Sequence, residues 1–257
     1  MSTIESSFHG VPDEFADTAI GLEDVSPLAC DTETMQWILD EVRDERPLPL
    51  IEAEAVVAAL FMEQRGPEGI RVRLGASRDA RSYHAVHALN VCMLAMTMGD
   101  ELQFDLPSIR RIGLAALLHD IGMMRVPADV IGKQGQITPE ERERVKNHPI
   151  EGARILLAAG RSMDLPAVVA YEHHLKMDGS GYPRVTYPRS PHYVSRLVQV
   201  CDVYEALSSA RPYRSAWPVE IILSYLNERA GFEFHPALTG ALAALIQRGV
   251  VRPVEGP

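Results

Sequence analysis

The sequence predicts an all-α fold, and three observations lead to this prediction. From Ala80 onward, apolar residues recur every three or four positions, which is the spacing of helices that bury one face. A complete helix-start signal, TPEE at residues 138–141, lies within this region. The sequence shows no convincing alternation of apolar and polar residues, which would indicate strands, and it contains no internal repeat. At 257 residues the chain is long enough to bury a sizeable core, in one large or two small domains.

The first part of the chain is less periodic than the rest. Residues 34–42 fit a short helix, the stretch RPLPL at 46–50 has the composition of a linker, and residues 51–65 return to helical spacing. Residues 66–79 contain glycines and charged residues and are expected to form a break. We therefore expect an N-terminal segment of residues 1–46 and a body of residues 47–257.

Four helices are expected to carry the function of the body. They cover residues 80–99, the stretch IRRIGLAALLHDIG after Pro107, a segment that opens with a Thr138–Glu141 capping box, and residues 194–209. On the first three, a stripe at helical spacing combines apolar residues with one histidine. These stripes are Tyr83, His87, Val91 and Leu94; Ile109, Ile112, Ala116 and His119; and Val145, His148, Gly152 and Ile155. The fourth helix carries Asp202 in an apolar stretch.

The charge of the chain is concentrated at its start. Residues 1–46 hold 12 acidic and two basic residues, which accounts for the whole formal net charge of −10. A neutral body disfavours generic nucleic-acid binding, which needs a basic surface. The acidic segment is expected to be a solvated face or a flexible tail, or else an element that docks a protein partner or a second copy of the chain.

Location is also suggested by composition. No apolar run approaches the roughly 20 residues of a membrane span, and the start has no secretion signal. The three widely spaced cysteines, Cys30, Cys92 and Cys201, are expected to be reduced thiols. We therefore expect a cytoplasmic protein.

Histidines and aspartates occur in five clusters along the body. They are His87, His119-Asp120, His148, His173-His174 and Asp202. A lone histidine on an apolar helix face is usually a core residue, but a buried carboxylate without a partner is strongly unfavourable, and a metal ion can offset that cost. Five imidazoles and two carboxylates are too many for one ion and suit two, with Asp120 as the natural bridge. Adjacent histidines on a helix point about 100° apart. His173 and His174 are therefore expected to serve two neighbouring ions, or one ion and a supporting partner.

The order and spacing of these clusters closely resemble the HD-GYP family, a subgroup of the HD phosphohydrolase superfamily. The matching stretches are YHAVHALNVCMLA, LLHDIG, VPADVIGKQGQITPEERERVKNHPIEGARIL, HHLKMDGSGYP and VCDVYEALSSARPYR. The resemblance covers residues from about 51 to 240. It implies an HD-domain helical bundle with a C-terminal HD-GYP helical extension. It also implies phosphodiesterase activity on the bacterial messenger cyclic di-GMP, at a metal site that often contains iron. The metal ligands it implies are His87, His119, Asp120, His148, His173, His174 and Asp202.

The expected chemistry is hydrolysis of a cyclic phosphodiester. Two metal ions, iron or alternatively manganese, would polarise the phosphoryl oxygen, and a metal-bridging hydroxide would attack phosphorus to give linear dinucleotide, GMP or both. The expected catalytic residues are Asp120, Tyr182 and Arg211. Arg211 and Arg214 would clamp phosphate oxygens, Tyr182 would contact the substrate, and Gly179 and Gly181 would let the backbone approach it.

One departure from the family pattern keeps a second interpretation open. Met123 stands where many relatives have a lysine, which removes a candidate phosphate-binding cation. The alternative function is therefore a very slow or non-catalytic receptor that binds a cyclic dinucleotide and signals to a partner. A hydrolase of another phosphate ester is a third possibility, against which the GYP loop and the RPYR stretch argue.

Overall fold

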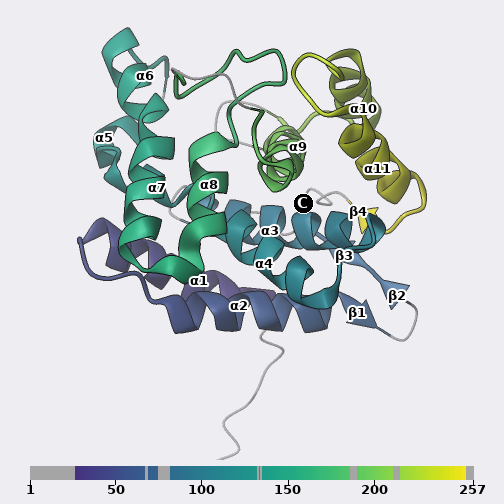
Figure 1. Ribbon diagram of the computed structural model, residues 1–257, viewed down its shortest axis with the longest axis horizontal. Coiled ribbons are helices and arrows are strands. Elements are labelled where there is room, and N and C mark those ends of the chain that lie inside the picture. The colour runs from purple at the N-terminus through teal and green to yellow at the C-terminus, as the bar shows by residue number, and fades with distance from the viewer. Residues whose placement is uncertain are drawn as a thin grey trace, which may run out of the picture.

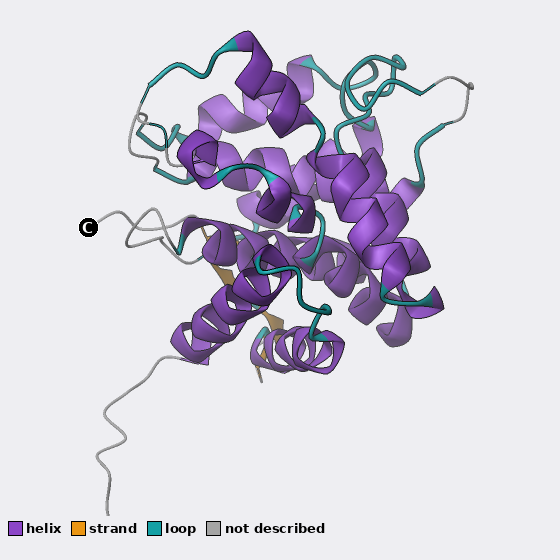
Figure 2. Ribbon diagram, turned by 90° about the vertical axis from the view of Figure 1, so that its left-hand side faces the viewer, coloured by secondary structure: helices purple, strands orange, loops and turns teal. Residues whose placement is uncertain are grey.

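The computed structural model describes residues 27–66, 69–74, 82–131, 133, 135–185, 190–210 and 215–252. Within these ranges the chain folds into helices joined by turns, which confirms the all-α prediction (Figure 1). A view turned by 90° shows helices throughout the molecule (Figure 2). Among the described helices, none combines the length and the apolar character needed to cross a membrane.

The elements follow one another in this order along the chain. The helices are α1 (Pro27–Arg43), α2 (Leu50–Glu63), α3 (Tyr83–Glu101), α4 (Leu106–Leu117), the 3-10 turn η1 (Ile121–Arg125), α5 (Ala128–Ile131), α6 (Pro139–Lys146), α7 (His148–Ala158), η2 (Arg161–Met163), α8 (Asp164–Glu172), α9 (Tyr193–Ser208), α10 (Val219–Glu228) and α11 (Pro236–Gln247). The strands are β1 (Arg65–Gly66), β2 (Gly69–Ile70), β3 (Val72–Arg73) and β4 (Val251–Arg252).

Three of the four strands, β1 to β3, lie within or at the edge of the stretch that was expected to form a break. β1 pairs antiparallel with β2, and β3 pairs parallel with β4 from the end of the described chain. Each strand has two residues, which is too short for apolar and polar residues to alternate visibly.

Helix α3 is the centre of the core. All of its residues from Ala85 to Gly99 are buried, so it buries every face rather than the single stripe that the sequence predicted. It packs against α1, α4, α9 and α11. The polar side chains of His87 and Asn90 are therefore held in an apolar interior, where they need partners.

Helix α1 differs from the solvated or partner-docking segment expected before residue 46. Its side chains Met35, Ile38, Leu39 and Val42 are buried in the same core as α3. Arg125 in η1 donates a hydrogen bond to the Val42 carbonyl over 2.9 Å, at the C-terminal end of α1. The apolar stripe on α1 explains the packing, and Glu33, on another face of the helix, is exposed. Residues 1–26 lie outside the described residues, and the division of the chain at residue 46 stays a prediction.

The expected third helix is in fact two helices. The capping box is confirmed: the Thr138 hydroxyl accepts from the Glu141 amide, and the Glu141 carboxylate accepts from the Thr138 amide. α6 then ends at Lys146 and α7 begins at His148. The physical reason is Pro149, which has no N–H to donate to the Val145 carbonyl and so interrupts the run of helical hydrogen bonds.

Candidate metal centre

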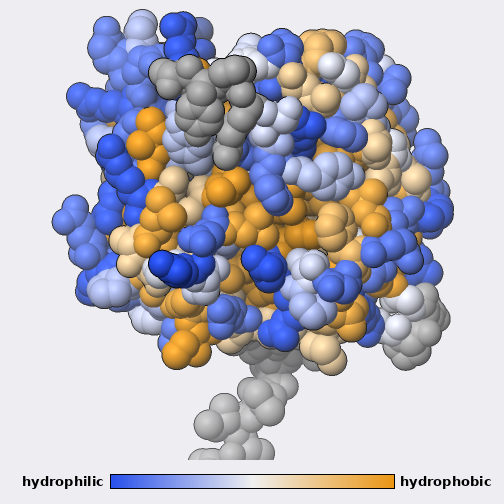
Figure 3. Space-filling view, in the orientation of Figure 1, coloured by the Kyte–Doolittle hydropathy of each residue, from blue (hydrophilic) through white to orange (hydrophobic). Residues whose placement is uncertain are grey.

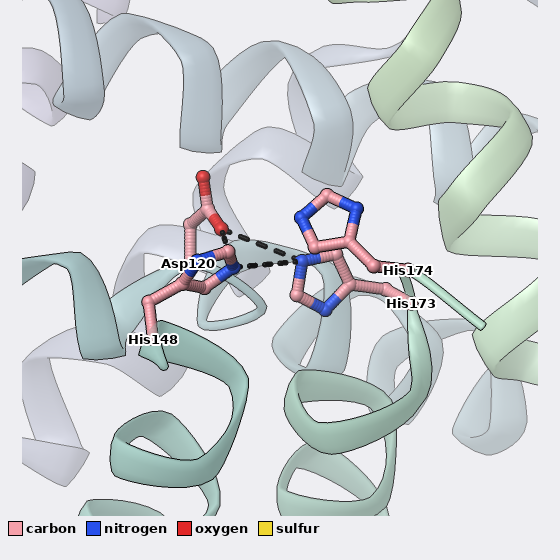
Figure 4. Close-up of side chains that lie close together, drawn as sticks. All are labelled: Asp120, His148, His173 and His174. Carbon is pink, nitrogen blue, oxygen red and sulfur yellow. Dashed lines mark hydrogen bonds and ion pairs between the residues drawn. The ribbon is translucent and has the colours of Figure 1, made fainter. Parts of the chain in front are cut away.

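The seven histidines and aspartates predicted to bind metal come together in the structure. Their ligand atoms form three overlapping groups, each within 4.8 Å. The groups are Asp120, His148, His173 and His174; His87, His119 and Asp120; and His119, His173 and Asp202. They come from α3, α7, α9 and the ends of α4 and α8, so the fold gathers residues that are up to 115 positions apart in sequence. Figure 4 shows the first group, with the imidazoles of His148 and His173 directed at the Asp120 carboxylate.

Asp120 lies between the two halves of the cluster. Its Oδ1 is 3.0 Å from His148 Nε2 and 3.5 Å from His173 Nε2. Its Oδ2 is 3.9 Å from His87 Nε2 and 3.8 Å from His119 Nε2. One carboxylate thus presents each oxygen to a different pair of imidazoles, which is the arrangement that a bridging ligand requires.

Asp202 completes the half that contains His87. Its Oδ1 lies 3.3 Å from His87 Nε2 and 3.9 Å from His119 Nε2. The side chain is only 12% exposed, so the carboxylate is held against the imidazoles rather than in water. Each half of the cluster therefore contains at least one carboxylate oxygen close to its imidazole nitrogens.

Three histidines owe their orientation to main-chain carbonyls at helix ends. His119 Nδ1 donates to the Ala116 carbonyl over 2.7 Å at the end of α4, and His173 Nδ1 donates to the Ala170 carbonyl over 2.9 Å at the end of α8. Carbonyls in a helix's last turn have no partner within the helix, so they are free to accept. His148 Nδ1 donates over 2.8 Å to the Val145 carbonyl, the acceptor that Pro149 leaves free. In each ring Nδ1 holds the hydrogen, which leaves Nε2 as a lone-pair donor facing the cluster.

His87 is oriented by a side chain that the sequence analysis missed. Its Nδ1 hydrogen-bonds to the buried carboxylate of Glu205, which also accepts from Asn90 Nδ2 over 2.9 Å and from the Ser209 hydroxyl over 2.8 Å. Glu205 lies one helical turn after Asp202 in the same apolar stretch. The argument applied to Asp202, that a carboxylate in apolar surroundings needs a partner, could have found it.

The donors fit metal ions. His119 Nε2 is buried and has no hydrogen-bond partner among the described residues, which is costly unless an ion accepts its lone pair. Burial lowers the pKa of His119 to about 4, so the ring is neutral at pH 7. Burial disfavours the ionised form of Asp120, but His119 and His148 outweigh it and hold the pKa of Asp120 well below its ordinary value. Neutral imidazoles and ionised carboxylates are the forms that bind metal.

The pKa is shifted upward at His87 and His148 and downward at His174. Burial disfavours the charged form of His148, but Asp120 outweighs it and raises the pKa of that ring. Burial disfavours the charged form of His87, yet Glu205 and Asp202 raise its pKa well above the ordinary value. Burial and the neighbouring His173 instead lower the pKa of His174 well below the ordinary value. A cation placed between Asp120 and Asp202 would substitute for the His87 proton, so metal binding should release a proton there.

The paired histidines meet differently from the expectation. Their ring centroids are 4.0 Å apart, and both rings belong to the group around Asp120. The reason is that α8 ends at Glu172, so His174 has left the helix and the 100° relation between neighbours in a regular helix no longer applies.

The GYP loop is built around the His174 carbonyl. A Cβ at Gly181 would lie 2.1 Å from that oxygen, and the Gly181 φ of +99° favours glycine, so the loop's own packing already requires this residue. Gly179 has a φ of +83° within the turn. The Tyr182 ring centroid lies 4.4 Å from that of His174. Tyr182 thus lies beside the cluster as predicted, whereas close approach of the two glycines to a ligand stays a prediction.

Two other expectations concern cations near the cluster. Arg211 and Arg214 lie outside the described residues, so their role as a phosphate clamp stays a prediction. Met123 packs against the hydrophobic core, and the guanidinium of nearby Arg125 is bound to the Val42 carbonyl of α1. Arg125 therefore does not replace the cation that Met123 lacks.

Comparison with known proteins relates this geometry to a family. The sequence matches the HD domain family over residues 70–238. A cyclic di-GMP phosphodiesterase of Pseudomonas aeruginosa is 39% identical over 146 residues, which cover 57% of this chain and 34% of that protein. A cyclic di-GMP phosphodiesterase of Thermotoga maritima is 32% identical over 67% of this chain and 46% of its own length. A 3'3'-cGAMP-specific phosphodiesterase of Vibrio cholerae is 31% identical over 68% of this chain and 38% of its length.

The chain therefore spans less than half the length of these curated relatives. Among solved structures, an HDG"Y"P protein from Bdellovibrio bacteriovorus superimposes with a TM-score of 0.61 at 15% identity, covering 86% of this chain and 70% of that one. This likeness shows the fold. The match over residues 70–238 shows that the chain belongs to the HD domain family, and the GYP loop beside the histidine–aspartate cluster agrees with the predicted resemblance to its HD-GYP subgroup.

Proposed function

We propose that this chain is a metal-dependent phosphodiesterase that hydrolyses a cyclic dinucleotide, with cyclic di-GMP as the first substrate to test and linear dinucleotide, GMP or both as products. The observation that carries the proposal is the pair of imidazole groups that share Asp120, one on each carboxylate oxygen. The names of the curated relatives support the substrate class, since they include both cyclic di-GMP and 3'3'-cGAMP phosphodiesterases.

We infer that the cluster holds two transition-metal ions, iron first and manganese second, because mixed imidazole and carboxylate ligation suits both. The ligands are the predicted seven, with Asp120 as the bridge. When bound, such ions polarise a phosphoryl oxygen and lower the pKa of a coordinated water. Glu205 and the three helix-end carbonyls hold the imidazoles in place, so that little reorganisation is needed when metal and substrate bind.

Tyr182 is the described residue best placed to contact the substrate. Burial, with a further contribution from Asp120 and Asp202, raises the pKa of its hydroxyl, so the group keeps its proton at neutral pH. It can therefore donate a hydrogen bond to a phosphate oxygen or to the departing ribose oxygen. We assign the other contacts to the phosphate that is being cleaved to Arg211 and Arg214, which the sequence predicts to clamp phosphate oxygens.

The decisive experiment is turnover of cyclic di-GMP by anaerobically purified protein of measured metal content. Product formation that tracks metal content and disappears in Asp120→Ala, together with most of the bound metal, is the expected result. Met123 favours a second candidate, because it carries no charge and the nearby Arg125 is held by the Val42 carbonyl. Tight binding of cyclic di-GMP without product, in protein that holds both metals, would favour that receptor function.

We also propose a cytoplasmic location, supported by the free, buried thiols of Cys92 and Cys201. A protein partner or a second copy docking through the N-terminal segment stays a prediction. A pull-down and a sedimentation measurement on the full chain would test it, and a monomer without partners would refute it.

A further inference from the structure

A cleft beside the metal cluster extends past Tyr182, and its other walls have no role in the chemistry described so far. It has a volume of about 580 Å³ and lies between the α6–α7 junction and the loop of residues 176–184. Asn147 and Tyr182 both line it. Asn147 immediately precedes His148, and the Tyr182 ring packs on His174, so the cleft and the cluster share a wall.

The cleft gathers positively charged side chains in a body, residues 47–257, whose formal charges cancel overall. Lys146, Lys176 and Arg184 line it, against the single acid Glu143. Over α5 and α6, at the upper left of Figure 3, the surface is strongly hydrophilic. A body without net charge that gathers three cations around one cavity has a place suited to an anion.

Two of these cations are available to a ligand. Lys176 is already paired with Glu233 Oε1 at 3.0 Å. Lys146 is paired with Glu143 Oε1 at 2.7 Å, but that glutamate is 72% exposed, and such a surface pair contributes little and exchanges readily. Arg184 is exposed and forms no ion pair within the part of the chain that the structure describes.

We propose that this cleft binds the half of a cyclic dinucleotide whose phosphodiester is not being cleaved, with Lys146 and Arg184 contacting its phosphate. The inference rests on the proposed function, because it needs the other phosphate at the cluster. A cyclic dinucleotide carries two phosphates in one ring, so placing one at the cluster brings the second toward the adjoining wall. The cleft volume falls within the range of roughly 300–1,000 Å³ typical of small-molecule sites.

The test compares two substrates in metal-loaded full-length protein. Cyclic di-GMP spans cluster and cleft, whereas bis(4-nitrophenyl) phosphate offers a single phosphodiester with no second phosphate. We expect the ratio of kcat/KM for cyclic di-GMP to kcat/KM for bis(4-nitrophenyl) phosphate to fall about 10²-fold in the Lys146→Ala/Arg184→Ala double variant. This is about tenfold per cation, or about 1.4 kcal/mol each. Arg144→Ala is the matched control, since Arg144 is an exposed cation on the same helix as Lys146 and does not line the cleft.

The outcomes separate the two proposals. An unchanged ratio in the double variant, with cyclic di-GMP still hydrolysed by the wild type, overturns the cleft assignment and leaves the proposed function standing. An equal fall in the ratio for Arg144→Ala also overturns it, because the effect would then come from general surface charge. If metal-loaded wild type neither binds nor hydrolyses cyclic di-GMP, the proposed function fails, and the cleft assignment fails with it.

Discussion

A single methyl group added at Gly122 should disrupt the metal cluster. Gly122 lies in η1, two residues after Asp120, where α7 crosses it. A Cβ there would lie 2.0 Å from the His148 carbonyl oxygen and 2.4 Å from the Gly152 nitrogen. Both are backbone atoms, which cannot rotate away as a side chain does. The first turn of α7 would therefore have to move away from η1.

The size of this movement follows from the contact distances. Ordinary Cβ contacts begin near 3.4 Å, so the His148 backbone would retreat by about 1.4 Å. His148 Nε2 and Asp120 Oδ1 are now 3.0 Å apart, and metal–ligand distances tolerate deviations of only ~0.2 Å. Overpacking costs about 1–3 kcal/mol, and a backbone clash should reach the upper end. At roughly 2–4 °C per kcal/mol, the Tm of Gly122→Ala should fall by roughly 6–12 °C.

The assay is thermal unfolding together with metal titration, and two other glycines provide controls. Gly240→Ala adds a methyl group with nothing within 4 Å and should be neutral or slightly stabilising. Gly113→Ala meets the flexible Met96 side chain at 2.7 Å, so it should lower Tm yet keep the metal stoichiometry. Only Gly122→Ala should lose metal. Wild-type metal affinity in Gly122→Ala would refute the reasoning that this close approach sets the position of His148.

Three further predictions use other parts of the structure. Glu205→Gln should weaken metal affinity about 10–100-fold, measured by competition with a chelator, because the hold on His87 Nδ1 is weakened. A chain that begins at residue 47 should lose most of its stability, whereas a chain that begins at residue 27 should not. The reason is that each buried apolar side chain of α1 contributes about 1.5–3 kcal/mol to the free energy of unfolding. Equal Tm values for the two shortened chains would contradict this prediction. Burial and a nearby glutamate raise the pKa of Asp31 to about 6, so the folded state keeps a proton that the unfolded state releases near 3.8. Stability is then lost as pH rises from about 4 to 6, and Asp31→Asn should raise Tm at pH 7.5 but not at pH 4.

The grouping of the metal-site residues could be predicted because each of them stands out in its own short stretch of sequence. His87, His119 and Asp202 are polar residues in stretches that must be buried, and each demands a partner wherever the fold places it. The predicted capping box at Thr138 was equally local, because its two reciprocal hydrogen bonds involve residues three apart. Such local patterns can be recognised in the sequence without knowledge of the tertiary structure.

What could not be predicted depends on which elements meet. Because the segment before residue 46 is acidic, its composition did not predict that α1 packs on the core. This packing depends on one apolar stripe of α1 and on the Val42 carbonyl, which accepts a hydrogen bond from Arg125 in η1. The convergence of His173 and His174 depends on where α8 ends, and helix ends are poorly fixed by periodicity. The positive cleft combines residues from α6 and from a loop some 30 positions later, and neither segment is unusually basic on its own.

The helix break at Asn147 provides the last prediction, because it links a backbone rule to the metal site. Pro149 cannot donate to the Val145 carbonyl, and His148 Nδ1 uses that acceptor instead. Pro149→Ala would restore an N–H that competes for this carbonyl and could join α6 to α7 as one helix. The His148 ring would then lose the hydrogen bond that directs its Nε2 toward Asp120, so metal affinity should fall about 10–100-fold while Tm stays near the wild-type value. Pro236→Ala, at the equivalent first turn of α11 and away from the cluster, should leave the metal affinity unchanged. Unchanged metal affinity in Pro149→Ala would mean that Asp120 alone, rather than the freed carbonyl, fixes the orientation of His148.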